Sequence, residues 1–448
     1  MQTLIKNATI VNEGKKIKSD LLIKGNRIVK IGENITFSDF NEEDIIIDAE
    51  GLWLLPGVID DQVHFREPGL THKADIYSES RAAAAGGVTS YMEMPNTYPP
   101  AVNMKLLIEK FEIAEKKSAV NYSFFLGATN ENIEEIKNVD KQTIAGIKMF
   151  LGSSTGNMLV DKSESIRKIL SESPVIVAAH CEDDNIIKYN LEKYENIYGE
   201  DIPVKFHPAI RSEEACYSSS SKVVKIAEET GGRLHIFHLS TEKELELLSD
   251  KPLKSKKVTA EVCVHHLWFN DGDYDRLGTK IKWNPAVKKE SDRLALIRAL
   301  KDGKIDIVAT DHAPHTIEEK DNVYVSAPSG APMVQHSLLA MIELSKQGYF
   351  SVEEIVKWMS HNPAELYDID SRGFIREGYY ADLVLVDPDS FTKVEKNNLF
   401  YKCGWSPLEG VVFNSKIKTT FVNGKIVYND GRIIEANAAM KLDFKRTY

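Results

Sequence analysis

Strand-like and helix-like segments alternate along most of this chain, and this alternation restricts the fold more than any other feature. From about residue 53, short apolar runs are separated by longer segments whose apolar residues recur with the helical period of 3.6. Eight strands that each precede a helix-length segment predict an α/β fold, the (β/α)8 TIM barrel, with a doubly wound open sheet as the alternative. The eight runs lie at residues 57–65, 88–95, 120–129, 146–152, 174–181, 233–240, 258–267 and 305–312.

The two ends of the chain have a different pattern. Residues 1–52 and 373–448 contain short stretches of alternating apolar and polar residues, broken by Asn, Gly and Asp as in strands joined by turns. We expect the two ends to meet in one accessory β-sandwich domain beside a barrel formed by residues 53–372. A length of 448 residues accommodates a large barrel with an accessory domain.

Composition excludes several classes of protein. The formal net charge of −11 argues against a nucleic acid or an anionic membrane as partner. The sequence has no run of about 18 apolar residues and starts without a signal-peptide pattern, so we expect no membrane span. The four cysteines form no CxxC pair, which favours a reducing cytoplasm and argues against a sulfur-bound structural zinc site.

Polar residues concentrate where the predicted strands end. In a barrel of parallel strands these ends share one face, which is where active sites lie. Imidazole and carboxylate ligands suit zinc and related first-row ions, so a metal centre is expected there. For each candidate histidine the alternative is a hydrogen-bonded structural histidine, and for Asp311 it is a helix cap. His235, His265 and His266 are assigned such structural roles. The five candidate ligands are His64, Lys148, His180, His238 and Asp311.

The first strand of the predicted barrel is the densest in polar groups. Side chains alternate along a strand, so Asp60, Gln62 and His64 are expected on one face. Arg66 follows where the strand should end, and its planar guanidinium is suited to binding an anion. The sequence predicts a metal site with an anion-binding group beside it.

Lys148 is the least expected residue in the metal-binding set. It lies between Ile147 and Met149 in a buried strand, and a lysine is almost never fully buried unless it is paired. A neutral amine there can capture carbon dioxide and become a carbamate, whose two oxygens can bridge two metals. The alternative is a salt-bridged lysine, or one that extends its charged end to water.

Six motifs along the chain resemble those of the cyclic amidohydrolase superfamily. HFREPG, MPNT (which ends the second motif) and DHAPH together are similar to the dihydroorotase branch of that superfamily. The likeness extends to the C-terminal segments GYYADLVLVDPD and VNGKIVY and covers nearly the whole chain. The six motifs are HFREPG at 64–69, AAAAGGVTSYMEMPNT at 82–97, IKMF at 147–150, HLST at 238–241, WNPAV at 283–287 and ATDHAPH at 309–315.

The resemblance implies roles for individual residues. It implies one or two Zn²⁺ ions bound by the five candidate ligands, with Lys148 carboxylated, and it makes Asp311 the catalytic acid and base. Arg66 and Asn96 would hold a substrate carboxylate, His315 would add a further contact to it, and Asn284 would contact the pyrimidine ring. The implied reaction is the reversible cyclisation of N-carbamoyl-L-aspartate to L-dihydroorotate in pyrimidine biosynthesis.

Two positions depart from the pattern of the resembled branch. Gln62 stands where the family usually has the first histidine of His-x-His, and an amide oxygen is a weaker zinc ligand than an imidazole. Lys148 stands where many long-chain dihydroorotases have aspartate. A lysine at this position resembles the hydantoinase and allantoinase branches and the shorter dihydroorotases. Two alternatives therefore stay open: a hydantoinase-like or allantoinase-like cyclic amidase, and a non-catalytic homologue that assembles with a partner such as aspartate carbamoyltransferase.

Two further expectations concern assembly and access to the site. The resembled family is often dimeric, so a homodimer acting on a small-molecule substrate is expected. Residues 316–332 are rich in charge, Pro and Gly and follow the last predicted barrel strand. They are interpreted either as a lid over the site or as an ordinary surface loop.

Overall fold

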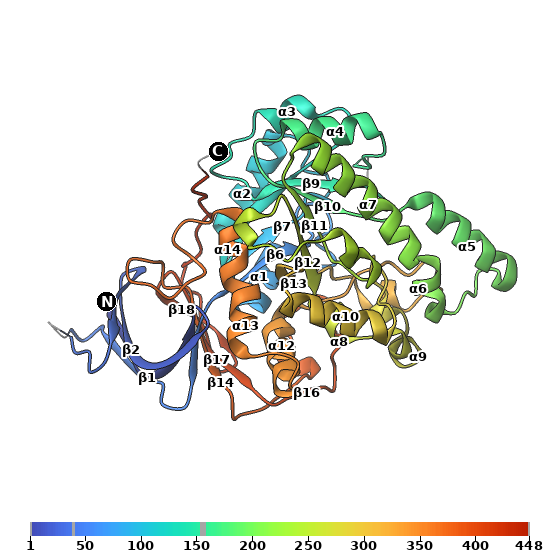
Figure 1. The fold of residues 1–448 in the computed structure, drawn as a ribbon. Coiled ribbons are helices and arrows are strands. Elements are labelled where there is room, and N and C mark those ends of the chain that lie inside the picture. The colour runs from blue at the N-terminus through green and yellow to red at the C-terminus, as the bar shows by residue number, and fades with distance from the viewer. Residues whose placement is uncertain (1, 38–40, 153–157, 447–448) are drawn as a thin grey trace.

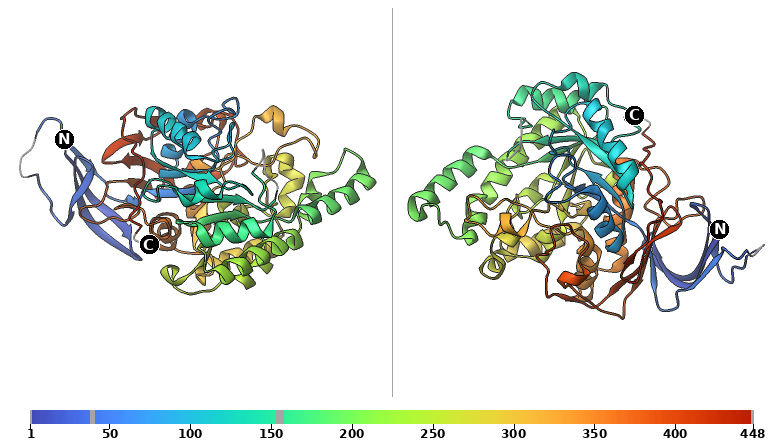
Figure 2. Two further views of the ribbon diagram at one scale, coloured as in Figure 1. Left: turned by 90° about the horizontal axis from the view of Figure 1, so that it is seen from above. Right: turned by 180° about the vertical axis from the view of Figure 1, so that it is seen from behind.

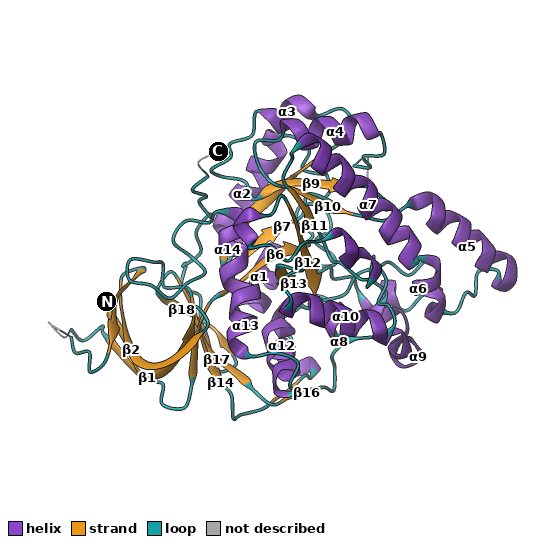
Figure 3. Ribbon diagram, in the orientation of Figure 1, coloured by secondary structure: helices purple, strands orange, loops and turns teal. Residues whose placement is uncertain are grey.

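The protein consists of a barrel and a curved sheet at its side, seen in a computed structural model that describes residues 2–37, 41–152 and 158–446 (Figure 1). Helices surround the barrel strands, whereas the sheet at the side is made almost entirely of strands (Figure 3). The sheet and helix α5 (Asp184–Tyr198) lie at opposite ends of the molecule in both views of Figure 2. Among the described residues, no helix combines the length and apolar character needed to cross a membrane.

The described residues contain eight barrel strands, and each pairs in parallel with the next along the chain. The last strand returns to the first: Val63 and His312 form a parallel bridge, and the His64 N–H donates to the His312 carbonyl at 2.7 Å. The predicted TIM barrel is confirmed. The strands are β6 (Val58–Val63), β7 (Val88–Glu93), β8 (Asn121–Gly127), β9 (Gly146–Phe150), β10 (Val177–His180), β11 (Leu234–Ile236), β12 (Val258–Cys263) and β13 (Ile307–Ala309).

Helices cover the outside of the barrel and several begin at side-chain caps. The Asp75 carboxylate accepts the Ser78 N–H at 2.8 Å, and the Asn103 amide oxygen accepts the Leu106 N–H at 3.0 Å, so both satisfy N–H groups that lack a partner within the helix. The longer helices are α1 (Ile76–Ala85), α2 (Met104–Lys117), α4 (Ser163–Glu172), α7 (Glu213–Thr230), α10 (Glu290–Lys301) and α12 (Ser337–Lys346). Short helices are α3 (Ile133–Lys137), α6 (His207–Ile210), α8 (Val264–Trp268), α9 (Tyr274–Leu277), α11 (Ile317–Lys320), α13 (Val352–Val356) and α14 (Asn362–Tyr367).

Two segments differ from the sequence-based expectation. The apolar run 258–267 was predicted as one strand, but β12 ends at Cys263 and α8 begins at Val264. The helical pattern over 352–367 is divided between α13 and α14 by a π-helical segment at Lys357–His361. In both segments hydrophobicity alone does not mark the change of backbone conformation, because buried apolar residues continue across it.

The strands from the two chain ends share one mixed sheet, which contains nine described strands and is strongly curved in Figure 1. β5 joins the two ends, because Trp53 pairs with Thr9 on one side and with Val386 on the other. The strands are β1 (Gln2–Asn12), β2 (Lys15–Lys24), β3 (Arg27–Gly32), β4 (Ile45–Asp48), β5 (Trp53–Pro56), β14 (Leu383–Asp387), β17 (Lys416–Val422), β18 (Lys425–Asn429) and β19 (Arg432–Ile433). β15 (Thr392–Lys393) and β16 (Val412–Phe413) form a separate pair.

The last described residues return from this sheet to the barrel. Leu442 and Phe444 pack in the same apolar cluster as Phe125 and Phe237 of the barrel interior. The buried guanidinium of Arg446 donates to the carbonyls of Lys141, Ile144 and Ala145, just before β9 begins. The C-terminal segment therefore closes the N-terminal end of the barrel and leaves the other end open.

Candidate active site

A cavity of about 710 Å³ opens at the C-terminal ends of the barrel strands, which we call the mouth of the barrel. Every residue that the sequence nominated as a ligand or substrate contact lines it, although these residues are spread over 252 positions of the chain. Parallel strands bring them together because their C-terminal ends share one face. They are His64, Arg66, Asn96, Lys148, His180, His238, Asn284, Asp311 and His315.

The first strand does not keep the simple alternation that the sequence suggested. Its pairing with β7 shifts register between Asp60 and Val63, as in a β-bulge. Gln62 and His64 line the cavity, but Asp60 turns away and accepts the Thr310 hydroxyl at 2.6 Å. Burial raises the pKa of Asp60 to about 7. The expectation that Asp60 shares the face of Gln62 and His64 is therefore wrong, because the bulge changes which side chains point inward.

Asp311 and His64 form the first donor pair at the mouth. His64 Nε2 lies 3.1 Å from Asp311 Oδ1, and the Gln62 amide donates to the same oxygen at 3.3 Å. His64 Nδ1 is 2.8 Å from the side-chain oxygen of Asn96, which fixes the ring with Nε2 toward Asp311. Burial lowers the pKa of His64, so its imidazole is held neutral.

His180 and His238 form the second donor pair. His180 Nδ1 lies 3.0 Å from His238 Nε2. His180 Nε2 is 3.0 Å from the Glu182 carboxylate, which also forms an ion pair with Arg211. Burial, and to a smaller extent the neighbouring His180, lowers the pKa of His238 well below its usual value. The Nδ1 atom of His238 has no hydrogen-bond partner among the described residues.

Lys148 lies in the same cavity and is 1 % exposed. Its ammonium nitrogen has no hydrogen-bond partner in the described part of the chain and lies 3.9 Å from the Phe237 ring centroid. Burial lowers the pKa of Lys148 to about 8, against the opposing effect of Glu261 and Asp311. The amine is therefore neutral more often near pH 7 than that of an ordinary lysine, and the neutral form is the one that captures carbon dioxide.

The mouth residues fit a divalent metal centre. One imidazole–carboxylate pair and one pair of imidazoles face the same cavity, and His238 Nδ1 and Lys148 Nζ are buried without a hydrogen-bond partner in the described residues. Buried polar atoms are nearly always satisfied in proteins, so atoms left without a partner mark the place of a ligand. Neutral imidazoles are the form that coordinates metal.

Arg66 brings a positive charge to one side of the cavity. It is 7 % exposed, and its Nη2 lies 3.1 Å from His315 Nε2 while its Nε donates to the Pro314 carbonyl at 3.1 Å. Burial lowers the pKa of Arg66 only to about 10, so it stays charged. Burial, together with Arg66, lowers the pKa of His315 to about 3 and keeps it neutral. Lys73 adds a second cation, with Nζ 3.1 Å from His315 Nδ1.

Three of the residues around the cavity have an uncommon backbone conformation. Arg66, His238 and Asp311 have φ angles of 67°, 41° and 45°. Non-glycine residues with positive φ are infrequent and concentrate at functional sites, where the surrounding structure holds them in place. All three angles fall at the ends of barrel strands, where they turn a side chain into the cavity.

The remaining wall of the cavity comes from the segment after His315. Pro328, Ser329 and Gly330 line the cavity, and Asn284 faces it with a side-chain oxygen that has no hydrogen-bond partner among the described residues. The buried ammonium of Lys320 donates to the carbonyls of Pro328 at 2.7 Å and Gly330 at 2.9 Å. Part of the 316–332 segment is thus a wall of the cavity, and a buried lysine holds it in place.

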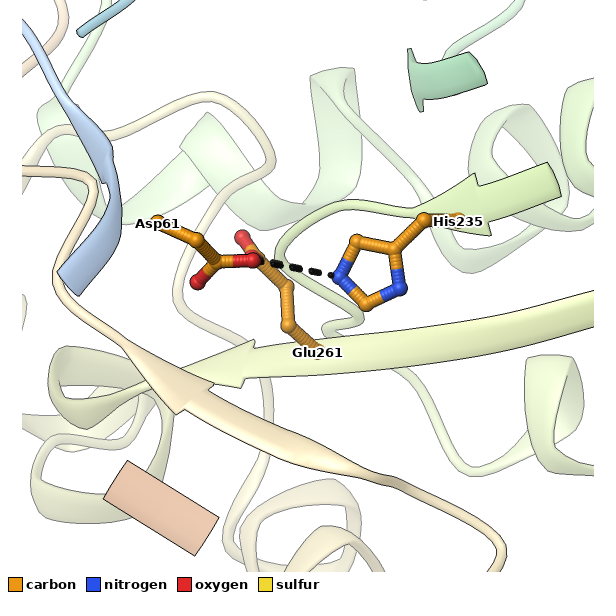
Figure 4. Close-up of side chains that lie close together, drawn as sticks. All are labelled: Asp61, His235 and Glu261. Atoms are coloured by element: carbon orange, nitrogen blue, oxygen red, sulfur yellow. Dashed lines mark ion pairs between the residues drawn. The ribbon is translucent and has the colours of Figure 1, made fainter. Parts of the chain in front are cut away.

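Sequence reasoning missed several residues of the site. Lys73 and Glu182 carry no motif of their own and become relevant only because the fold brings them to His315 and His180. A buried cluster of Asp61, His235 and Glu261 was also missed, and His235 had been assigned a structural role (Figure 4). The available signal was the presence of two acids, Asp61 and Glu261, inside runs predicted to be buried strands.

Comparison with known proteins gives the family. The profile of the amidohydrolase family matches residues 53–427. The chain belongs to the amidohydrolase family. A dihydroorotase from Methanosarcina mazei is 33% identical over 420 residues, covering 91% of this chain and 90% of its own. An allantoinase from Bacillus velezensis is 32% identical over 435 residues, covering 96% of this chain and 94% of its own.

Solved structures agree with this assignment. The L-hydantoinase (dihydropyrimidinase) from Arthrobacter aurescens superposes with a TM-score of 0.92 at 25% identity and covers 98% of this chain and 99% of its own. Dihydroorotases, allantoinases and hydantoinases all hydrolyse cyclic amides, and this amidohydrolase is a cyclic amide hydrolase. The resemblance read from the six motifs is confirmed.

Proposed function

We propose that this amidohydrolase is a zinc-dependent dihydroorotase, a cytoplasmic enzyme that interconverts N-carbamoyl-L-aspartate and L-dihydroorotate in pyrimidine biosynthesis. The observation that carries the proposal is the buried, charged Arg66 at the wall of the metal-binding cavity. Dihydroorotate differs from plain cyclic amides by a carboxylate, and a planar guanidinium can bind a carboxylate through two parallel hydrogen bonds. The dihydroorotase relatives support the same substrate.

The substrate carboxylate would lie between Arg66 and Asn96. Both line the cavity, and the side-chain oxygen of Asn96 is engaged by His64, so its amide N–H groups are the donors it offers to a ligand. Neutral His315 and the cation Lys73 lie next to Arg66. Asn284 would accept a ring N–H, since its buried side-chain oxygen has no hydrogen-bond partner in the described residues.

His64, His180, His238, Asp311 and a carboxylated Lys148 would hold one or two zinc ions. Zinc, when bound, polarises a carbonyl as a Lewis acid and lowers the pKa of water. A carbamate would form by attack of the neutral Lys148 amine on carbon dioxide with release of a proton, which leaves one negative charge. It would add an anionic oxygen ligand to the set, in which Gln62 is a weak ligand.

Asp311 would move the proton during ring opening. Its Oδ1 accepts the Gln62 amide N–H and faces His64 Nε2, which leaves Oδ2 for proton transfer. As water adds to the amide carbon, the Asp311 carboxylate accepts the water proton and delivers it to the ring nitrogen when the C–N bond breaks. Ring closure uses the same groups in reverse. Arg66 and Asn96 contribute by orienting the amide carbon toward the water.

A hydantoinase-like or allantoinase-like activity is the second candidate. Two observations favour it: the allantoinase from Bacillus velezensis is nearly as similar as the dihydroorotases, and the L-hydantoinase has a TM-score of 0.92. Lys148 is common to these branches by resemblance. Arg66 favours the dihydroorotase, because neither hydantoin nor allantoin carries a carboxylate for it to bind.

Substrate competition tests the proposal. L-Dihydroorotate and 5,6-dihydrouracil share a ring and differ by the carboxylate, so they are a matched pair; hydantoin and allantoin complete the set. We expect kcat/KM for dihydroorotate to exceed that for dihydrouracil by about 100-fold, the discrimination given by one lost charged contact of about 3 kcal/mol. Equal or reversed values would reject the dihydroorotase in favour of the other cyclic amidases.

A further inference from the structure

A second group of metal-ligating side chains lies inside the barrel, below the mouth. Asp61, His235 and Glu261 come from β6, β11 and β12 and point toward one another (Figure 4). All three are completely buried. In the described ranges, this is the one group of three His, Cys, Asp or Glu side chains whose ligand atoms lie within 4.8 Å of one another. We call it the interior cluster.

The interior cluster is separate from the cavity. Asp61 comes one residue before Gln62 in its strand, and His235 comes three before His238. Gln62 and His238 line the cavity, whereas no member of the interior cluster does. Because the strands run toward the mouth, residues earlier in each strand lie deeper in the barrel. Substrate in the cavity would therefore not reach the interior cluster.

The surroundings of His235 can accommodate the tautomer that a metal ion at Nε2 requires, with the proton on Nδ1. The Thr259 hydroxyl oxygen lies 2.8 Å from His235 Nδ1 and can accept that proton, since its own proton has an acceptor in the Leu234 carbonyl at 3.3 Å. Nε2 of His235 faces Asp61 Oδ2 and Glu261 Oε2, each at 3.5 Å.

Each of the two carboxylates has one oxygen that lacks a hydrogen-bond partner in the described part of the chain. Asp61 Oδ2 accepts the Tyr367 hydroxyl at 2.8 Å, and Glu261 Oε1 accepts the His238 backbone N–H at 3.2 Å. Asp61 Oδ1, Glu261 Oε2 and His235 Nε2 have no hydrogen-bond partner in the described part of the chain. Buried carboxylate oxygens and imidazole nitrogens without a partner are strongly unfavourable unless a cation or a proton compensates them.

The distances and the charge suit a first-row divalent ion. Zinc–nitrogen and zinc–oxygen bonds of about 2.0–2.2 Å in a tetrahedron place neighbouring ligand atoms roughly 3.4 Å apart. The two measured separations of 3.5 Å match this edge and are too long for good hydrogen bonds. Two carboxylates and a neutral imidazole would neutralise a divalent cation, and the imidazole favours zinc over calcium or magnesium.

We propose that Asp61, His235 and Glu261 bind a divalent first-row metal ion, zinc by its chemistry, in a structural site inside the barrel and separate from the mouth. The ion would cross-link β6, β11 and β12 and thereby stabilise the barrel beneath the cavity. This site does not depend on which cyclic amide the enzyme hydrolyses. The competing occupant is a proton shared between the two carboxylates.

Anomalous diffraction locates the ion directly. Crystals of the full chain, expressed with added zinc, should show a zinc peak between Asp61, His235 and Glu261 in data collected at the zinc edge. Zinc at the mouth alone, or no peak at either place, would overturn the interior site. The position of the peak identifies the site that holds the zinc. A crystal that has lost zinc from the mouth therefore still tests the interior cluster.

Metal content of two matched variants gives an independent test. Glu261→Gln keeps the shape of the side chain and removes one ligand, so it should lose one zinc per chain by elemental analysis. Asp60→Asn changes a buried carboxylate on the same strand outside the interior cluster, and should keep the wild-type content. Unchanged zinc in Glu261→Gln would overturn the proposal.

The Tm of Glu261→Gln distinguishes a bound ion from a shared proton, because the two predict Tm changes of different sign. If zinc is bound, Glu261→Gln should lower the Tm of the zinc-loaded protein, because a cross-link between three strands is lost. If the interior cluster holds only a proton, removing a buried acid should leave the Tm unchanged or raise it. An unchanged or higher Tm would therefore contradict the metal site.

Discussion

The mouth and the interior of the barrel contain the same kinds of side chain in different arrangements. At the mouth, donors form two separate pairs around a cavity of about 710 Å³. In the interior cluster, three donors converge within 4.8 Å and are completely buried. This difference shows that residue type alone does not define a catalytic centre. The mouth has space for a substrate, whereas the interior cluster lies outside that cavity.

Replacing the proposed acid and base should have the largest effect. Asp311→Asn keeps the size of the side chain and removes its ability to accept a proton, so kcat should fall by about 10²–10⁴-fold. Zinc content should remain, since His64, His180, His238 and Lys148 are unchanged. Steady-state kinetics with elemental analysis measures both. Turnover near the wild-type rate would mean that the mouth does not use Asp311 for proton transfer.

Removing the anion-binding group should have the next largest effect. Arg66→Ala should lower kcat/KM for dihydroorotate by roughly 100-fold, because a charged contact of about 3 kcal/mol is lost. Arg66→Lys should recover only part of this, since an ammonium cannot form two parallel bonds. Hydrolysis of dihydrouracil is the control and should be nearly unchanged. A similar loss for both substrates would indicate a structural role for Arg66.

A substitution at the closed end of the barrel should lower the stability of the protein and leave substrate binding unchanged. Arg446→Ala removes donors to the carbonyls of Lys141, Ile144 and Ala145 at the end opposite the mouth. We expect the free energy of unfolding to fall by about 2–3 kcal/mol, as buried acceptors lose a charged partner. Urea unfolding measures this, and KM should stay at the wild-type value. A raised KM would show that the two ends are coupled.

The wall of the cavity should give the smallest effect. Lys320→Met removes the bonds to the Pro328 and Gly330 carbonyls but keeps the apolar stem. We expect KM to rise by roughly tenfold, the equivalent of about 1.4 kcal/mol, with little change in kcat. Glu318→Gln, on the same short helix, serves as a matched surface control. An unchanged KM would show that this segment does not shape the cavity.

Much of the fold and the mouth could be predicted because each depends on a strong local signal. Apolar runs separated by helix-length segments identify a parallel barrel, and its geometry brings the strand ends together. His64, His180 and Asp311 could therefore be placed at one site, although they are far apart in sequence. Their roles as ligands and as acid and base remain predictions.

The remainder could not be predicted because it depends on contacts that no local pattern records. The register shift after Asp60 reverses the direction of that side chain, and one extra residue in a strand has no mark in the sequence. The interior cluster joins Asp61, His235 and Glu261 across the barrel. Each is a single polar residue in an apolar strand, and only the closed sheet shows that they face one another.

A crystal structure of Asp311→Asn with L-dihydroorotate bound tests the central claim most directly. Loss of the catalytic carboxylate should keep the substrate intact, so its position in the cavity can be seen. The account predicts that the substrate carboxylate lies on Arg66 and Asn96, with the ring toward Asn284 and the amide carbonyl toward His64 and His180. A carboxylate directed away from Arg66, or a substrate outside the cavity, would contradict it.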